Sequence, residues 1–329
     1  MRIVYVHKRF SPGGFSISTL FSAIGKEISD MGIDVTHYEL TGNLFRDVVA
    51  LRKIKADIYH ITGDVNYMVL PLPWKKTVLT VHDMGHYRFR LKGLKKFIYK
   101  WIWFTIPLRI AQQVTAISES TKSELIKFTG MKAGKITVIQ NCYSQIFVES
   151  PKVFNSGNPR ILQIGTSYHK NVISVVRSLQ GLSCTIVLVG RIGSELMREL
   201  KANDAHFENL IDVDQAKIYE EYLNSDIVSF VSLTEGFGIP IIESQVVGRA
   251  LITSNISPMA NISGAGAYLA DPFDIEDIRR GFDTIINDSQ FRDRIIAEGL
   301  RNVRNYCPAR VANLYVEIYT KQIYFLKNW

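Results

Sequence analysis

Short runs of β-branched and aliphatic residues alternate along the whole chain with longer segments of helical periodicity. No other feature constrains the fold more, because continuous apolar strands separated by helices are typical of parallel sheets covered on both faces. In the first half, strands are predicted at 2–7, 57–62, 77–82, 113–117 and 136–140. In the second half, they are predicted at 160–165, 185–190, 226–231 and 250–254.

A polar stretch separates the two sets of strands. The segment "SPKVFNSGNP" at 150–159 is rich in Pro, Gly, Ser and Asn, which is typical of a linker. A chain of 329 residues is long enough for two domains, each with its own core. We therefore expect an α/β protein with two doubly wound parallel-sheet domains that divide at about residue 150.

Composition excludes several classes of protein. Hydrophobic residues make up 47% and charged residues 21%, a globular balance without low-complexity tracts. Three widely spaced cysteines, Cys142, Cys184 and Cys307, fit neither a disulfide framework nor a zinc site, so a reducing cytoplasm is expected. The opening "MRIVYVH" reads as a buried strand and not as a secretory signal. No stretch approaches the length of about 20 apolar residues that a membrane-spanning helix needs.

The net charge of +8 is concentrated in one window, because no acidic residue occurs between Asp83 and Glu119. The basic residues there are Arg88, Arg90, Lys92, Lys95, Lys96, Lys100 and Arg109. They are interleaved with apolar residues that include Trp101 and Trp103, as in an amphipathic helix that rests on anionic lipid. Two alternatives remain: a domain helix whose aromatic face is core and whose lysines are solvated, and a nucleic-acid surface without any recognised motif.

Residues that follow the predicted strands carry the candidate chemistry, because ligands of such sheets bind outside the carboxyl ends of the strands. Gly13 and Gly14 follow the first strand, and His82 ends the third. In the second half, Lys170 lies beyond one strand and Arg191 directly after another. The segment "TEGFGIPIIES" at 234–244 follows a third.

Two glutamates flank the Gly-Phe-Gly turn of that last segment. Glu243 could simply favour the dipole of the helix that Pro240 begins, but this would not explain Glu235 on the preceding loop. An acid among apolar neighbours needs hydrogen-bond donors, such as sugar or ribose hydroxyls. Glycine-spaced amides at a helix N-terminus, with a lysine nearby, would bind a diphosphate.

Together these segments resemble the retaining nucleotide-sugar glycosyltransferases of family four, the glycosyl transferases group 1. That family has the GT-B fold, two Rossmann-like doubly wound parallel-sheet domains facing a central cleft. The resemblance is most specific at 234–254 and in "GAYLADPFD" at 266–274. It implies an acceptor-binding domain at 1–150 and a nucleotide-sugar domain at 151–308. A terminal helix at 309–329 is expected to cross back to the first domain.

The resemblance also assigns roles. Glu235 would meet hydroxyls of the donor sugar, Glu243 the ribose and Lys170 of "GTSYHKN" the diphosphate, while His82 of "TVHD" would reach the donor sugar. The expected catalytic residues are thus His82, Lys170 and Glu235. Further donor-binding residues are expected at Gly13, Gly14, Thr166, Arg191, Gly236, Phe237, Gly238 and Ile239.

The sequence departs from the family at one notable point. The arginine that usually accompanies the phosphate-binding lysine is replaced by His169 or Thr166, and Arg191 or Thr166 would have to compensate.

Three other patterns permit different interpretations. Asp212 and Asp214 form an Asp-x-Asp that could hold a metal, although Asp214 is more simply a helix N-cap. "HDMGH" places His82 and His86 four residues apart, a weak metal pattern. Gly13-Gly14 lacks the G-x-G-x-x-G of a dinucleotide site.

The resemblance predicts a retaining, metal-independent hexosyltransferase without a cofactor. Its donor would be a nucleotide sugar such as GDP-mannose, UDP-glucose or UDP-N-acetylglucosamine, and its acceptor a glycan or lipid-linked hydroxyl in bacterial cell-surface polysaccharide synthesis. We expect a cytoplasmic protein, peripheral on the inner face of the membrane, with no nucleic-acid partner. The alternatives are a non-catalytic GT-B subunit that binds glycan or a partner, and a sugar-nucleotide epimerase.

Overall fold

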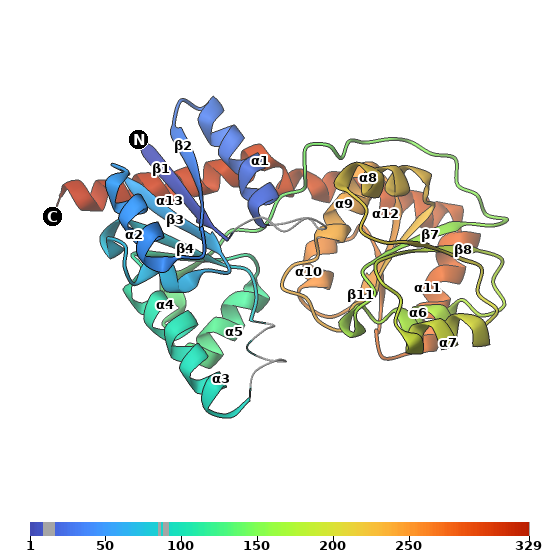
Figure 1. The fold of residues 1–329 in the computed structure, drawn as a ribbon. Coiled ribbons are helices and arrows are strands. Elements are labelled where there is room, and N and C mark those ends of the chain that lie inside the picture. Colours follow the sequence, from blue (N-terminus) through green and yellow to red (C-terminus); the bar gives the residue numbers. More distant parts are fainter. Residues whose placement is uncertain (9–16, 85–86, 88–91, 329) are drawn as a thin grey trace. The chain divides into compact units, whose positions relative to one another are not determined.

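The computed structural model describes residues 1–8, 17–84, 87 and 92–328. It divides into two compact units. The N-terminal unit comprises Met1–Cys142 together with Cys307–Trp329, and the C-terminal unit is Tyr143–Tyr306. Each unit is a parallel sheet with helices on both faces (Figure 1), so the expected α/β, doubly wound fold class is confirmed. Of the helices in these described ranges, none is long and apolar enough to cross a bilayer.

Sheet A of the N-terminal unit has six strands in the order β2-β1-β3-β4-β5-β6, and every pairing is parallel. Its interior strands carry side chains that are buried on both faces, as continuous apolar runs predict. The strands are β1 (Arg2–His7), β2 (Asp34–Glu39), β3 (Ile58–Gly63), β4 (Thr77–Val81), β5 (Gln113–Ala116) and β6 (Ile136–Val138).

The terminal helix α13 (Pro308–Lys327) belongs to this unit and packs against α1 (Ile17–Asp30) and sheet A. Tyr319 Oη lies 2.6 Å from Nδ1 of His60, and Tyr315 Oη lies 3.3 Å from Oγ1 of Thr80. Buried hydrogen bonds therefore join α13 to β3 and β4 of sheet A. Apart from short 3₁₀ turns, the other helices in the described part of this unit are α2 (Leu44–Lys53), α3 (Gly93–Tyr99), the π-helix η4 (Lys100–Thr105), α4 (Ile106–Ile110) and α5 (Glu119–Thr129).

Sheet B of the C-terminal unit also has six parallel strands, in the order β12-β11-β10-β7-β8-β9. Because β7 and β10 are neighbours, the loops that follow them meet at the carboxyl edge of the sheet. The strands are β7 (Arg160–Ile164), β8 (Thr185–Val189), β9 (Phe207–Leu210), β10 (Ile227–Phe230), β11 (Ala250–Ser254) and β12 (Tyr268–Ala270).

The helices of this unit are divided between the faces of sheet B. Figure 1 shows α8 and α9 on one side and α6, α7 and α11 on the other. The second group shares one hydrophobic cluster with Ile161, Ile227 and Ile252 of the sheet. The bounds are α6 (Val172–Ser178), α7 (Ser194–Ala202), α8 (Gln215–Asn224), α9 (Ile239–Val247), α10 (Met259–Ser263), α11 (Ile275–Asn287) and α12 (Ser289–Asn302).

Two sequence predictions differ from the structure. The segment 150–159 is not a free linker, because Arg249 donates to the Ser150 carbonyl at 2.8 Å and Asp226 accepts from the amide of Asn155 at 3.1 Å. These bonds fasten it to the C-terminal unit, so the division falls earlier, after Cys142. The strands β2, β9 and β12 were not predicted, because they are short or half-exposed and lack a continuous apolar run.

Candidate functional site

The structure brings Lys170 and Glu235 together at the carboxyl edge of sheet B. Lys170 ends the 3₁₀ turn η6 (Tyr168–Lys170) after β7, and Glu235 lies on the loop after the neighbouring strand β10. Lys170 Nζ donates to Oε1 of Glu235 at 2.6 Å, and both side chains are largely shielded from solvent. Two residues 65 positions apart therefore form one ion pair at the edge where such sheets bind ligands.

Backbone features that the sequence reading missed hold this lysine in place. Gly165 has φ +86°, and a Cβ there would lie 3.0 Å from Cε of Lys170. The carbonyl of His169 accepts from the amide of Leu233 at 2.8 Å, which ties the two loops together. The Lys170 ammonium also lies 4.6 Å from the ring centre of Phe230, within cation–π range. In the sequence, Gly165 just before the loop that carries Lys170 could have indicated this close approach.

The helix α9 begins immediately after Gly238, whose φ of +121° is a conformation that glycine adopts readily. Pro240 lies in its first turn, and among the described residues no side chain caps it. Gly236 and Ile239 flank this start. Phe237, by contrast, is buried and packs edge-on against Tyr306, 5.9 Å between ring centres, so its side chain is core.

Glu243 lies in the second turn of α9, so the dipole explanation, which needs an acid in the first turn, is wrong. Its side chain is 4% exposed, and Tyr222 Oη of α8 donates to its Oε2 at 2.8 Å. Burial raises the pKa of Glu243 to about 7, and the Tyr222 hydrogen bond lowers it in part. Sequence reasoning missed Tyr222, since nothing in a single sequence pairs it with Glu243.

Thr166 and Arg191 meet at the same edge. Thr166 Oγ1 donates to the carbonyl of Arg191 at 2.6 Å, and a Cβ on Gly190, φ +133°, would lie 2.9 Å from that hydroxyl. The exposed guanidinium of Arg191 pairs with Oδ2 of Asp212 at 2.9 Å. Asp214 caps α8 by accepting from the amide at position 217, as the N-cap interpretation predicted. The two carboxylates of the Asp-x-Asp thus have separate partners.

His82 lies in the other unit, directly after β4. Its Nε2 lies 2.7 Å from the carbonyl oxygen of Thr62, which can only accept, so this nitrogen carries the proton. Burial lowers the pKa of His82, which favours the neutral ring and leaves Nδ1 as an acceptor. A Cβ on Gly63, φ +143°, would lie 2.5 Å from Cδ2 of His82, so only glycine admits this ring.

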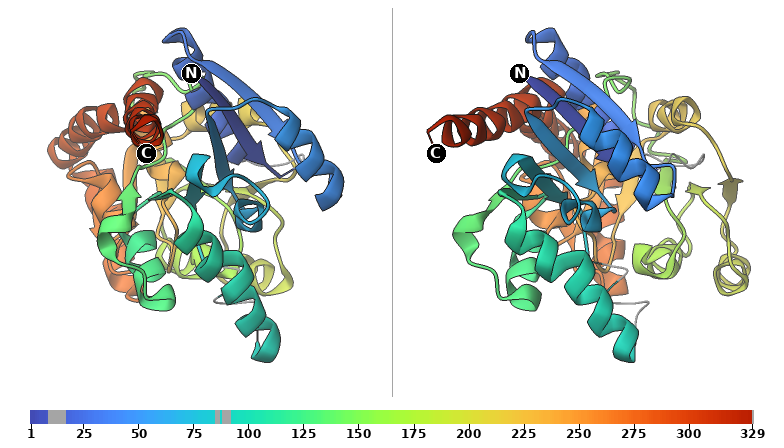
Figure 2. Two further views of the ribbon diagram at one scale, coloured as in Figure 1. Left: turned by 90° about the vertical axis from the view of Figure 1, so that its left-hand side faces the viewer. Right: turned by 60° about the vertical axis from the view of Figure 1, so that its left-hand side comes forward.

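The basic window forms α3, η4 and α4, and α3 reaches beyond the body of its unit in every view (Figure 2). Its apolar face is not core: Leu94 is 73% and Phe97 59% exposed, and Ile98, Trp101 and Ile102 are exposed as well. The prediction that Trp103 belongs to the exposed surface is wrong. Its ring stacks on that of Tyr99, with 4.9 Å between the ring centres, and packs against the core. Tyr99 and Trp103 are four residues apart and share one helical face, which differs from the exposed face of Leu94, Phe97 and Trp101.

Several expected residues lie outside the described ones. These are Gly13, Gly14, His86, Arg88 and Arg90.

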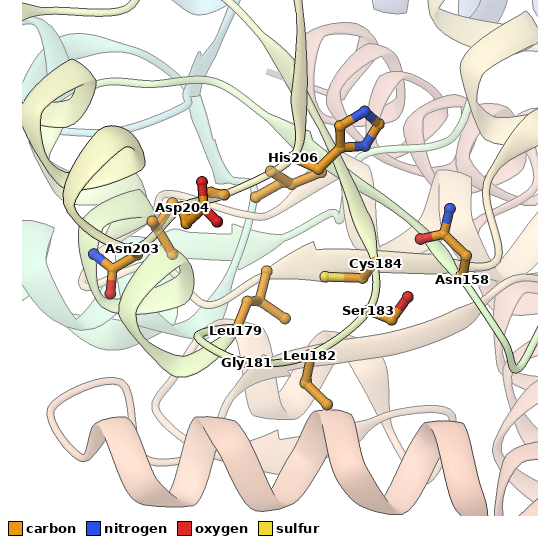
Figure 3. A pocket seen from close by; sticks show the side chains of 12 residues that line it. Asn158, Leu179, Gly181, Leu182, Ser183, Cys184, Asn203, Asp204 and His206 are labelled. Carbon is orange, nitrogen blue, oxygen red and sulfur yellow. The ribbon is translucent and has the colours of Figure 1, made fainter.

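A cavity of about 340 Å³ lies at the opposite, amino edge of sheet B (Figure 3). Asn158, Cys184 and His206, which line it, precede the strands β7, β8 and β9 respectively. It is therefore separate from the Lys170–Glu235 pair, which lies at the carboxyl edge.

Comparisons with known proteins agree with this geometry. Residues 149–301 match the family model of the glycosyl transferases group 1, and residues 22–144 match the model of glycosyltransferase family 4. The O-antigen chain mannosyltransferase B of Escherichia coli is 24% identical over 82% of this chain and 77% of its own length. The N,N'-diacetylbacillosaminyl-diphospho-undecaprenol alpha-1,3-N-acetylgalactosaminyltransferase of Campylobacter jejuni is 21% identical over 91% and 88%.

Solved structures share the fold. Anabaena HepE, solved in complex with UDP and glucose, superposes with a TM-score of 0.74 at 15% identity, over 97% of this chain and 99% of its own. The two family models together match most of the chain, and the fold is shared over nearly its whole length. The chain belongs to the group 1 glycosyltransferases of the GT-B fold.

Proposed function

We propose that the protein transfers a hexose from a nucleotide diphosphate sugar to a hydroxyl of a glycan or lipid-linked acceptor, with retention of anomeric configuration and without a metal. The observation that carries this proposal is the Lys170–Glu235 ion pair beside the glycine-flanked start of α9. Relatives named for O-antigen and lipid-linked acceptors support a role in bacterial cell-surface polysaccharide synthesis.

The ion pair has the components that donor binding needs. When the diphosphate arrives, the Lys170 ammonium exchanges Glu235 for phosphate oxygens, and the released carboxylate accepts from sugar hydroxyls. The amides around Gly236 and Gly238 add positive potential at the start of α9. Thr166 and Arg191 extend this phosphate region, and Glu243 accepts from the ribose.

The chemical step breaks the bond between the sugar C1 and the diphosphate oxygen, and forms a bond from C1 to the acceptor oxygen on the same face. The acceptor proton passes to the departing diphosphate. Lys170 stabilises the negative charge that develops there, which is an electrostatic contribution. His82, neutral and with Nδ1 available as an acceptor, orients a hydroxyl of the donor sugar.

A thermal-shift panel of UDP-glucose, UDP-N-acetylglucosamine and GDP-mannose tests donor binding. A donor at about 100 times its Kd stabilises by about 2.7 kcal/mol, which is a readily measured shift. We expect one of these sugars to raise the Tm of the wild type and of Glu149→Gln, an exposed control, but not of Lys170→Met. If no nucleotide sugar shifts the wild type, the proposal is wrong. An assay in EDTA tests metal independence, and ¹H NMR of the product tests retention.

The surface of α3 and η4 is proposed to rest on the cytoplasmic face of an anionic membrane, close to a lipid-linked acceptor. The exposed apolar residues Leu94, Phe97 and Ile98 would enter the headgroup region. The lysines that flank them are Lys92, Lys95, Lys96 and Lys100.

Flotation with vesicles containing phosphatidylglycerol tests this surface. Each lysine near an anionic surface contributes about 1 kcal/mol, so changing these four to glutamine lowers the partition coefficient by about a thousandfold. The matched control neutralises four lysines elsewhere in the unit, Lys53, Lys55, Lys127 and Lys132. Equal flotation of both variants would rule the membrane surface out.

A further inference from the structure

Two aromatic side chains project into solvent at the carboxyl edge of sheet B. Tyr168, two residues before Lys170, is 88% exposed. Phe273, three residues after the end of β12, is 74% exposed. The proposed function gives neither ring a role at the Lys170–Glu235 pair, and core packing does not explain why these positions are aromatic. Large aromatic side chains that remain exposed beside a ligand site are typical of recognition surfaces.

The two rings are carried on turns that are joined to each other. The buried side chain of Asn171 donates through Nδ2 to the carbonyl of Pro272 at 2.7 Å, which connects the turn after β7 with the turn after β12. Within the first turn, the amide of Asn171 donates to the carbonyl of Tyr168 at 3.1 Å. Within the second, the amide of Phe273 donates to Oδ1 of Asp271 at 2.9 Å.

Because the backbone on both sides is fixed before any ligand arrives, binding to these rings requires little further ordering of the chain.

The position of the pair relative to the donor residues indicates its ligand. The turns that carry Tyr168 and Phe273 lead into α6 and α11, which cover one face of sheet B. Glu243, the proposed ribose residue, lies in α9 on the other face (Figure 1). The Lys170–Glu235 pair, where the donor sugar is proposed to lie, follows the two central strands. If the nucleoside of the donor lies toward Glu243, the side of the site that carries Tyr168 and Phe273 stays open to the acceptor.

We propose that Tyr168 and Phe273 form a stacking platform for pyranose rings of the acceptor glycan. A pyranose ring has an apolar C–H face and a rim of hydroxyl groups, so it can cover an aromatic ring while its hydroxyls stay hydrated. Two exposed rings on adjacent turns fit consecutive sugars of a chain better than a single monosaccharide. This inference rests on the proposed function, because it takes the donor position from it.

Saturation-transfer difference NMR on the full chain tests the platform. The probes are mannotriose, maltotriose and chitotriose as neutral glycans, and UDP and GDP as nucleotides. We expect at least one trisaccharide to bind the wild type, and its Kd to rise about tenfold in the double variant Tyr168→Ala/Phe273→Ala. Nucleotide binding should not change. The matched control is Phe45→Ala/Tyr324→Ala, which removes two exposed rings from the N-terminal unit and should leave both classes of ligand unaffected.

The outcomes separate this proposal from the one it rests on. If no trisaccharide binds the wild type, or if the double variant binds it equally well, the platform is wrong, while retained nucleotide binding leaves the proposed function standing. If the double variant loses UDP or GDP instead, the rings stack on the nucleobase and the glycan platform is likewise wrong. If the wild type binds neither nucleotide, the proposed function fails, and the platform loses its basis with it.

Discussion

The variant Glu243→Gln removes a buried, ionisable carboxyl group from α9 and keeps its shape. In the folded protein the pKa of Glu243 is raised by burial from 4.5 to about 7. The folded state therefore holds a proton that the unfolded state has lost between these two values, and stability falls as pH rises through this window. Glutamine cannot ionise, so the variant should not have this pH dependence.

The size of the effect follows from the two pKa values. A displacement from 4.5 to about 7 corresponds to about 3 kcal/mol once both states are ionised. Between pH 5.0 and pH 8.5, the advantage of the variant over wild type should grow by about 2–3 kcal/mol. For a unit of this size, that is a Tm difference of about 5–10 °C.

Thermal unfolding of wild type and Glu243→Gln at both pH values measures this directly, provided that the transition of the C-terminal unit is followed. Glu149→Gln, an exposed carboxyl group in the same unit, is the control and should change little with pH. If the variant is no more stable than wild type at pH 8.5, or its advantage is equal at both values, then Glu243 does not titrate as a buried acid. The stabilised variant is still expected to bind the donor more weakly, a trade-off common at functional sites.

Three further contacts of the candidate site residues can be tested by substitution. Lys170→Met leaves Glu235 shielded and without its ion pair, so the free energy of unfolding of the C-terminal unit, measured in urea, should fall by about 1–3 kcal/mol. Adding Glu235→Gln should restore part of this loss. Strictly additive effects of the two substitutions would contradict the pairing. Gly63→Ala forces the His82 ring to move, so sugar transfer should fall while nucleotide affinity, measured by calorimetry, stays constant; unchanged transfer would remove His82 from the site. Tyr222→Phe removes the hydrogen bond that lowers the pKa of Glu243 in the folded protein. The upper end of the pH range over which stability falls should therefore move upward in a Tm–pH profile, and a downward shift would refute the assignment.

The short segment 234–244 shows how much one sequence can predict. Its glycines and Pro240 correctly placed the start of a helix after a buried strand. The resemblance it carries led to the family that the comparisons later showed. Both results depend on local chemistry, since turn geometry and motif spacing are recorded in consecutive residues.

The same sequence analysis missed contacts that only packing in the folded chain creates. Trp103 was assigned to the membrane surface as one of the apolar residues interleaved with the basic ones, but it stacks on Tyr99 and packs against the core. Nothing in the sequence indicated that the ring of Phe237 is buried against Tyr306. The segment 150–159 was predicted to be the linker between the domains, yet Arg249 binds it to the C-terminal unit. Each of these contacts depends on side-chain packing that a run of consecutive residues does not reveal.

The sequence by itself was enough to predict the two parallel sheets and the family, and to single out Glu235 and Glu243 as candidate site residues. Apolar periodicity, turn residues and motif spacing are local properties, so they can be found in consecutive residues. Only the tertiary structure decided that Lys170 and Glu235 form an ion pair and that Glu243 is buried against Tyr222. It also decided that the rings of Tyr168 and Phe273 stand exposed on joined turns. The physical reason is that burial and charge pairing depend on which loops a parallel sheet brings to the same edge, and that order of strands is not written in any single segment.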